Sequence, residues 1–442
     1  MPAIFHFLEK LKPHIPPGGI AASERDEGMS PSSRFLCHNV AYRDVVRNPS
    51  APWKAEFVAA YFHHLKETHI VATDACTLAM KELEIPEDVD PKAKERIQER
   101  IAPFLRSIAS NMTVQIDYEL NGASSGQLKL GPSDGNGISS QVLDIPLVNE
   151  VTGTIPNAQD GPLKMSVSSF QQESVEHQSL TAIYETGTTY LAEDGGWSLI
   201  SDVDDTVKIS CVNDHKQLTR NTFVNVPQHS PGMPELYQKM HEAISTPDHP
   251  TPFFYISASP YNLYPFLRKF LKDSAYPDGM IILRDLSWFD IHSWYSRVND
   301  SFLHTIPIKE YKFDRFVKVS GWLPRTTWVC VGDSTQSDPE AYAQFYHHLE
   351  TLRATNPDAN EGRVARIWIR KVVGVNPKLE GTLNAPERFE RAFQGIPSEV
   401  WKVFEDGKEL MDQIDGVKRE REQIHQKHDE DGTNKQTRSP LQ

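Results

Sequence analysis

The chain has 442 residues, 38% of them hydrophobic and 10% aromatic, which is enough apolar material for two folded domains. A formal net charge of −14 at pH 7 argues against a nucleic-acid-binding protein and against unspecific adsorption to anionic lipid, so any membrane contact is expected to be local and peripheral. The four cysteines lack the spacing of zinc or disulfide motifs, and no apolar run reaches the roughly 20 residues of a membrane span, which predicts a cytoplasmic protein without a transmembrane segment.

The first part of the chain is expected to hold a mobile segment and then a helical region. Residues 1–34 combine a short amphipathic stretch, residues 4–11, with a loop rich in Pro, Gly and Ser. Residues 35–110 are predicted to be helical because apolar side chains recur there at helical spacing and Pro52 suits a first helical turn. The helices are expected over residues 52–65, 76–83 and 97–105.

Residues 111–195 are predicted to form a small domain rich in β-structure. Apolar and polar side chains alternate from Met112 onward, and clusters of Gly, Ser, Asn and Asp separate the runs. Strands are expected over residues 114–118, 128–130, 142–148, 163–167 and 181–184. Short strands at this spacing are typical of an antiparallel β-sandwich.

Residues 196–400 are predicted to form a second domain, of the α/β class. Strands are expected over residues 197–200, 253–256, 280–283, 327–331 and 364–369, and helices over residues 233–244, 263–271 and 339–349. Alternation of this kind indicates a doubly wound parallel sheet. Residues 401–442 are rich in charge and poor in aromatic residues, which predicts a C-terminal helix followed by a disordered tail.

Polar side chains follow the predicted parallel strands. Asp202 and Asp204 come after the first strand, and two carboxylates at this spacing can act as nucleophile and acid/base, although a helix cap explains them equally well. The further candidates are Ser257, Lys312 (with Lys309 as an alternative), Asp333 and Asp338. Each also suits an ordinary structural role as a cap, a solvated charge or a turn residue. Ligands of open α/β sheets bind at the carboxyl ends of the strands, so these residues together predict one site.

In this order, the motifs resemble those of the haloacid dehalogenase-like phosphotransferase superfamily. The resemblance implies that Asp202 attacks phosphorus to form an aspartyl phosphate, and that Asp204 protonates the leaving oxygen and then activates water. It implies that Ser257 donates a hydrogen bond to a phosphoryl oxygen and that Lys312 neutralises charge shared with Asp202. Asp205 is assigned a structural role.

The same resemblance implies a Mg²⁺ cofactor. Magnesium prefers hard oxygen ligands, which suits Asp202, the main-chain carbonyl of Asp204, and Asp333. Asp338 is expected in or near the coordination shell. We therefore expect the carboxylates of Asp202, Asp204 and Asp333 to converge on one cation-sized site, with those of Asp202 and Asp333 within about 6 Å of each other.

Residues 185–375 also resemble the catalytic domain of the actin patch protein phosphatidate phosphatases. The resembling segments are residues 199–208, 220–223, 231–237, 257–265 and 332–340. The resemblance implies hydrolysis of phosphatidic acid to diacylglycerol and phosphate at a membrane surface, with cortical actin or endocytic proteins as partners. The candidates for substrate binding are Thr206, which more simply secures the loop, Lys208, Arg220 and Ser259.

Two inserts are candidates for shaping the substrate site. The insert at residues 284–304 contains Trp288 and Trp294, which suit either a lip against lipid headgroups or packing on the sheet edge. The segment at residues 211–232 contains Lys216, Arg220 and His229 and is expected to form a flap whose cations either hold a second anionic group or face solvent.

Two other functions remain open at this point. One is a phosphatase of soluble phosphomonoesters or phosphoproteins. The other is a non-catalytic cytoskeletal adaptor with a vestigial phosphatase domain, against which the intact set of candidate catalytic residues argues.

Overall fold

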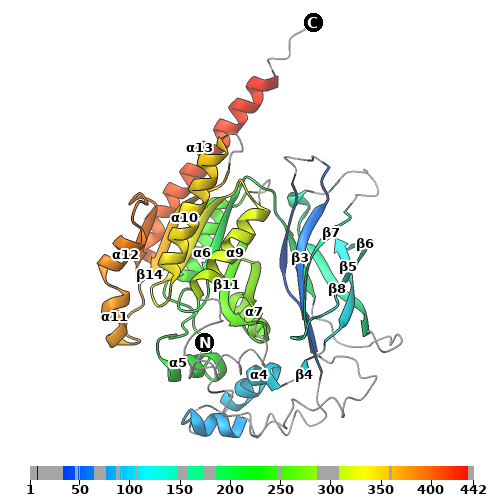
Figure 1. Ribbon diagram of the computed structural model, residues 1–442, viewed down its shortest axis with the longest axis vertical. Helices are drawn as coiled ribbons and strands as arrows, with labels where there is room; N and C mark the ends of the chain where they lie inside the picture. The colour runs from blue at the N-terminus through cyan, green and yellow to red at the C-terminus, as the bar shows by residue number, and fades with distance from the viewer. Residues whose placement is uncertain are drawn as a thin grey trace.

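Two β-sheets organise the part of the chain that the computed structural model describes (Figure 1). The described residues are 7, 33–44, 48, 50–63, 76–85, 90, 92–105, 107–108, 110–147, 155, 157–172, 186–246, 250–285, 308–357 and 361–436. The inserted residues 286–307 and most of residues 1–32, for which a lip, an amphipathic stretch and a mobile loop were predicted, lie outside these ranges, as do the strand expected at 181–184 and the end of the tail.

The N-terminal sheet has nine strands. They are β1 (Ser33–Leu36), β2 (Asn39–Tyr42), β3 (Trp53–His63), β4 (Ser107–Ile108), β5 (Met112–Leu120), β6 (Ala123–Leu130), β7 (Ile138–Ile145), β8 (Leu163–Gln172) and β9 (Gly187–Leu191). Alternate residues of β5 are buried, as the period of two predicts. Two groups of antiparallel strands enclose one core, and the parallel pair β2–β9 joins them, so the expected sandwich is continuous along one edge.

The helix predicted over residues 52–65 is wrong, because residues Trp53–His63 form strand β3. Phe57 and Tyr61 face the core of the N-terminal sheet, whereas Val58 and Ala60 face the core shared with the second sheet. A strand buried on both faces has no polar alternation, and its apolar residues also fall four positions apart, so periodicity cannot distinguish it from a helix. The later expectations hold better, since residues 76–82 are helical and α4 spans Ala93–Leu105.

The second sheet has six parallel strands in the order β12-β11-β10-β13-β14-β15. Their bounds are β10 (Trp197–Asp202), β11 (Phe253–Pro260), β12 (Gly279–Arg284), β13 (Thr327–Asp333), β14 (Arg363–Arg370) and β15 (Trp401–Phe404). The chain builds outward from β10 to β12 and then returns to place β13 on the other side of β10. The strand order therefore reverses between β10 and β13, where open α/β sheets bind ligands.

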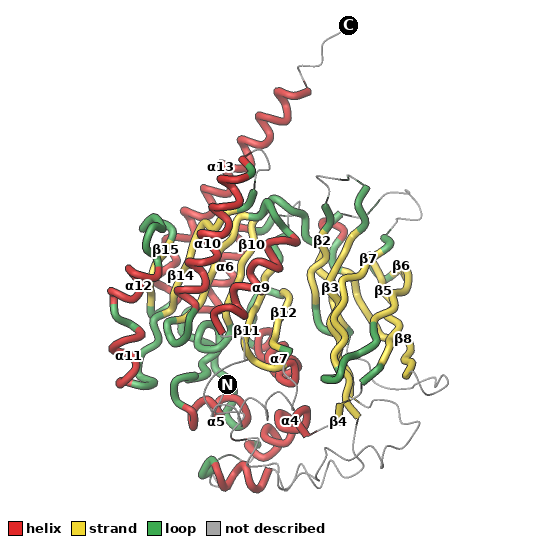
Figure 2. The backbone as a smooth tube through the Cα atoms, viewed as in Figure 1, coloured by secondary structure: helices red, strands yellow, loops and turns green. Residues whose placement is uncertain are grey.

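Helices cover both faces of this sheet (Figure 2). One face packs on α6 (Met233–Ile244), α7 (Tyr264–Asp273) and α13 (Met411–Gln436), and the other on α9 (Ile308–Trp322) and α10 (Asp338–Thr355). Leu199 of β10 lies in the first core and its neighbour Ile200 in the second. The predicted α/β architecture with a parallel sheet is confirmed.

Shorter helices complete the domain built on the parallel sheet. They are α5 (His215–Phe223), η4 (Tyr261–Leu263), α11 (Pro377–Leu383), α12 (Pro386–Ala392) and η6 (Gly407–Leu410). The C-terminal helix α13 projects away from the body of the protein (Figure 1). Within the described ranges, no helix combines the length and apolarity needed to cross a bilayer.

Candidate active site

A buried lysine lies between two aspartates at the strand reversal. Asp202 ends β10, Lys312 lies in the first turns of α9, and Asp338 begins α10. The Lys312 Nζ atom is 2.7 Å from Asp202 Oδ1 and also donates to Asp338 Oδ1. All three side chains are almost fully buried. Lys309, the alternative candidate for the catalytic lysine, is only partly buried. Lys312 is the lysine that contacts the predicted nucleophile Asp202.

Three buried carboxylates converge next to this lysine. One oxygen each of Asp202, Asp333 and Asp338 lies within 4.8 Å of the others, which confirms the expected approach of Asp202 and Asp333. Asp333 Oδ2 is buried without a hydrogen-bond partner. Gly332 permits this approach, because a Cβ atom there would lie 2.6 Å from Asp338 Oδ2. The cluster is a candidate metal centre made of hard oxygen donors.

The electrostatics of the cluster favour a cation. Burial raises the pKa of Asp202 to about 7, despite the opposing effect of Lys312. Burial, together with the charges of Asp338 and Asp202, raises the pKa of Asp333 well above its ordinary value. The charges of Asp202 and Asp338 outweigh burial and raise the pKa of Lys312, so this lysine stays protonated. One ammonium balances only one of three carboxylates, and a divalent cation could balance the others.

The carboxylate of Asp204 points to a different set of partners, which corrects the expectation that it joins the metal cluster. Its Oδ2 accepts hydrogen bonds from Ser257 Oγ (2.9 Å) and Ser259 Oγ (3.2 Å). Its Oδ1 accepts from Ser210 Oγ (2.6 Å) and lies 3.2 Å from Lys208 Nζ. Burial alone would raise the pKa of Asp204, but Lys208 and the serine hydroxyls lower it to about 2. In the site without substrate, the side chain of Asp204 is therefore an ionised carboxylate that its four polar neighbours hold in place.

The loop between these aspartates and α5 is shaped by Asp205. Its backbone has a φ of 62°, and its carboxylate accepts the main-chain N–H groups of Ser210, Cys211 and Val212 at 2.7 to 2.8 Å. This agrees with the structural role predicted for Asp205. Thr206 donates to Asp202 Oδ2 at 3.1 Å, so it contacts the predicted nucleophile instead of an open substrate site.

The sequence reasoning missed Ser210. Its hydroxyl contacts both Asp204 and Lys208, yet nothing in the sequence separates it from the chain's other serines. Lys208 was assigned to substrate binding, whereas its amino group is buried against Asp204 and Ser210 and lies 6.0 Å from the ring centroid of Phe266. Lys208 therefore acts on the Asp204 carboxylate in this state.

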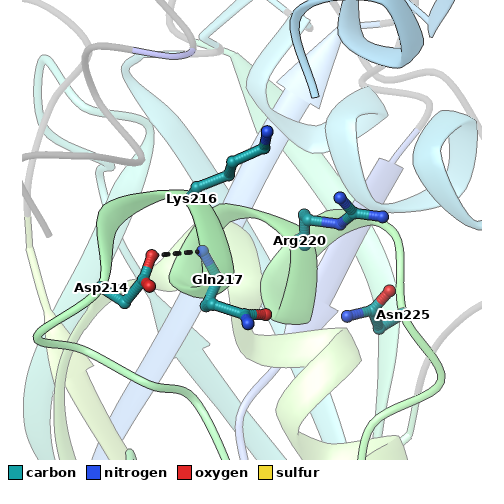
Figure 3. Close-up of a pocket in the computed structure, with 5 residues that line it drawn as sticks. All are labelled: Asp214, Lys216, Gln217, Arg220 and Asn225. Carbon is teal, nitrogen blue, oxygen red and sulfur yellow. Dashed lines mark hydrogen bonds between the residues drawn. The ribbon is translucent and has the colours of Figure 1, made fainter. Parts of the chain in front are cut away.

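A polar pocket of about 380 Å³ lies beside α5 (Figure 3). Its lining residues are Asp214, Lys216, Gln217, Arg220 and Asn225. Lys216 forms an ion pair of 2.5 Å with Glu84, and Arg220 donates to the carbonyl of Leu83 at 3.3 Å. The segment predicted as a flap thus contains α5, whose Lys216 and Arg220 contact Glu84 and Leu83.

The described part of the chain brings together most of the predicted site residues. Asp202, Lys312, Asp333 and Asp338 form one cluster, and Asp204, Ser257, Ser259 and Lys208 form another at the same edge of the sheet. Arg220 lies on α5, where its guanidinium donates to the carbonyl of Leu83. The two clusters are joined through the main chain between Asp202 and Asp204.

One known family matches this region. Residues 197–371 match the family model described as phosphatidate phosphatase APP1, catalytic domain. No curated protein matches the chain. The matched region runs from the first residue of β10 to just past β14 and includes every candidate site residue named above. The match supports the phosphatidate phosphatase family, and the chain is an enzyme with a phosphatidate phosphatase catalytic domain.

Proposed function

We propose that the protein is a Mg²⁺-dependent phosphatidate phosphatase with a haloacid dehalogenase-like catalytic domain, and that it acts through an aspartyl phosphate on Asp202. One observation carries the proposal. Asp202 is the last residue of β10, where the strand order reverses, and its carboxylate contacts Lys312 and lies close to the buried carboxylates of Asp333 and Asp338. Phosphoryl transfer requires a nucleophile, a positive charge and ligands for a metal cation in one place, and this site brings the three together.

The donor set fits magnesium. Asp202, Asp333 and Asp338 supply hard oxygens, to which the main-chain carbonyl of Asp204 would add a fourth, and Asp333 Oδ2 is buried without a hydrogen-bond partner. Bound there, Mg²⁺ would offset the charge of the phosphoryl oxygens and of Asp202. Lys312 would remain a fixed cation beside the nucleophile, since it contacts both Asp202 and Asp338.

Asp202 is oriented for attack by its two partners. Lys312 contacts one carboxylate oxygen and Thr206 the other, which restricts rotation of the carboxylate before substrate arrives. A nucleophile held in one orientation lowers the entropic part of the activation barrier. The bond that forms joins an Asp202 oxygen to phosphorus, and the bond that breaks joins phosphorus to the glycerol oxygen.

The proton for the leaving group is assigned to Asp204. In the free site Lys208, with the hydroxyls of Ser210 and Ser257, keeps this carboxylate ionised, and Ser259 also donates to it. An incoming phosphoryl group needs the hydroxyls of Ser257 and Ser259, and their transfer to the phosphoryl oxygens would make Asp204 easier to protonate. Asp204 would then protonate the departing alkoxide and later accept a proton from the water that hydrolyses the intermediate.

The substrate assignment is tested by comparing phosphatidic acid with soluble phosphomonoesters. We expect Mg²⁺-dependent release of phosphate and diacylglycerol from phosphatidic acid in detergent micelles, at a kcat/KM well above that for glycerol phosphate or a phosphopeptide. Equal or higher kcat/KM for the soluble esters would reject the lipid assignment and leave the phosphatase mechanism intact.

We also propose that the enzyme works in the cytoplasm at cortical actin or endocytic membranes, as the family resemblance implies. The acidic net charge supports a peripheral and local contact. Imaging of a fluorescent fusion beside actin and endocytic markers tests this location, and a uniform distribution would reject it.

A further inference from the structure

Most of the exposed large apolar side chains of the described residues lie in connections at the edge of the sheet that carries the site. Among the described residues, such side chains are Val142 (49% exposed), Val226 (62%), Val373 (49%) and Leu379 (44%). Val226 follows α5, and Val373 and Leu379 follow β14, so these three lie in connections at the carboxyl edge of the parallel strands. Only Val142, on β7, belongs to the other domain.

The segment carrying Val373 and Leu379 is attached directly to the loop of the candidate metal centre. We call residues 372–383 the α11 rim. The main-chain N–H of Val372 donates to Ser334 Oγ at 3.1 Å, and Ser334 follows Asp333 in the chain. The side chain of Asn376 donates to the carbonyl of Asn213 at 2.9 Å, which ties the rim to the segment before α5. The rim therefore borders the catalytic edge.

The rim is held in a shape that keeps its apolar side chains outside. The carboxylate of Glu380 accepts the main-chain N–H groups of Gly374, Val375 and Asn376 at 2.7 to 3.0 Å, and Gly374 has a φ of 80°. No residue of α11 is buried. A closed turn that leaves about half of the surface of Val373 and Leu379 in water gains less for the fold than full burial of those two side chains would.

We infer that the α11 rim is a membrane-docking surface, which inserts Val373 and Leu379 into the interfacial region of a phospholipid bilayer and brings the catalytic edge to the lipid headgroups. The inference rests on the proposed function, since an enzyme acting on a membrane lipid must bring its site to the bilayer. A net charge of −14 opposes attraction to anionic lipid, so apolar insertion is the remaining source of affinity. The ionised Glu380 carboxylate is held by three main-chain N–H groups of the turn, and the exposed ammonium group of Lys378 lies two positions before it in the chain.

The test compares the double variant Val373→Ser, Leu379→Ser with the matched control Val142→Ser. Each is sedimented with vesicles of phosphatidylcholine containing phosphatidic acid, after thermal melting has confirmed an unchanged Tm. We expect the double variant to lose vesicle partitioning by about tenfold or more, because two aliphatic side chains no longer leave water. The control should bind as the wild type does. Wild-type partitioning by the double variant would overturn the inference.

Activity assays and the salt dependence of vesicle binding distinguish a role in membrane docking from a role in catalysis. The double variant should lose hydrolysis in vesicles in proportion to its binding, yet keep wild-type kcat/KM on nitrophenyl phosphate and on short-chain phosphatidic acid dispersed as monomers. Raising the salt from about 0.1 to about 1 M should leave vesicle binding largely intact, because screening affects charge and not apolar insertion. Binding abolished by salt would overturn the inference.

Two further outcomes separate membrane docking from the proposed function and from self-association. If the wild type hydrolyses no form of phosphatidic acid and the double variant still loses vesicle binding, the proposed function fails and the docking surface stands. If the double variant changes only the oligomeric state, measured by analytical ultracentrifugation, and binds vesicles normally, the rim is an interface between copies and the inference fails.

Discussion

Two aspartates of one loop have opposite surroundings. Burial and neighbouring carboxylates raise the pKa of Asp202, whereas Lys208 and the hydroxyls of Ser210 and Ser257 lower that of Asp204 against the opposing effect of burial. The sequence predicted that these residues divide nucleophilic and acid/base work, but the separation of their side chains depends on contacts with residues as far as 110 positions away in the chain. Such contacts have no local signal, which is also why Ser210 was missed.

The nucleophile assignment is tested with Asp202→Asn. We expect this variant to lose turnover and to form no phosphoenzyme, because an amide is a poor nucleophile and a weak cation ligand. Its Tm should not fall, since a buried charge is removed. Near-normal Mg²⁺-dependent activity in this variant would falsify the assignment.

Asp205→Asn is the matched control for that experiment. Its carboxylate accepts three main-chain N–H groups, so we expect a lower Tm, with retained phosphoenzyme formation in the folded fraction. Calorimetry and acid-quench trapping measure the two properties separately.

The acid/base assignment predicts a dependence on the leaving group. In Asp204→Asn, turnover of phosphatidic acid should fall by on the order of a hundredfold or more, because alkoxide departure needs a proton. Nitrophenyl phosphate needs none, so its first step should partly recover and phosphoenzyme should accumulate. An equal loss of kcat on both substrates would show that Asp204 only supports the structure of the site.

Stability should depend on pH and on divalent cation together. Asp202 and Asp333 have raised pKa values in the metal-free fold, so the folded state binds more protons than the unfolded state, and stability should fall as pH rises from about 4 to about 7. Asp204 has the opposite shift, and its contribution is lost only as pH falls below about 4 toward about 2. Mg²⁺ should therefore raise the Tm more at about pH 7.5 than at about pH 5. A Mg²⁺ effect that is independent of pH contradicts this linkage.

At the scale of elements, the prediction of helices and strands succeeded for helices that bury one face and for short, apolar strands. The helix expected over residues 233–244 coincides with α6, which buries one face. Strand β3 was mistaken for a helix because two domains cover its opposite faces, and that second partner cannot be read from residues 53–63 alone. Domain packing, and not local propensity, decided its conformation.

Helix α5 depends on α4 for its C-terminal end. The Arg100 guanidinium donates to the carbonyls of Thr222 (3.1 Å) and Asn225 (2.8 Å) and lies 4.4 Å from the ring centroid of Phe266. We expect Arg100→Ala to lower the free energy of unfolding by roughly 1–3 kcal/mol, since buried carbonyls lose their donor. Hydrogen exchange should show faster exchange in α5.

Exposed Lys94 on the same helix offers the matched control. Lys94→Ala should leave both the unfolding free energy and the exchange of α5 within about 0.5 kcal/mol of the wild type. An equal effect of the two substitutions would show that α5 does not depend on the Arg100 contacts.

At the scale of the whole molecule, the two sheets share hydrophobic cores. Val40 and Ala192 lie in the core beneath α9 and α10, and Lys318 of α9 pairs with Glu56 of β3 at 2.5 Å. Near residue 195 the sequence changes from a pattern of short strands to alternating strands and helices, and this change indicated where one sheet ends and the other begins. It could not indicate that their cores are continuous, because those contacts join residues far apart in the chain.

This continuity predicts a single unfolding transition. Differential scanning calorimetry of the protein should give one endotherm with calorimetric and van't Hoff enthalpies in agreement, and Mg²⁺ should shift all of it. Two endotherms, of which Mg²⁺ shifts only one, would show that the sheets unfold independently.

The contact of Asp204 with Ser257 and Ser259 has a consequence for inhibitor discovery. A ligand that accepts hydrogen bonds from these hydroxyls competes with the Asp204 carboxylate, which is part of the same chain. The effective concentration of this carboxylate is on the order of millimolar or higher. Phosphate mimics should therefore bind the wild-type enzyme more weakly than their contacts suggest. An Asp204→Ala protein, freed of this internal competitor, is the more sensitive form for screening compound fragments, and the affinity difference between the two forms measures the competition directly.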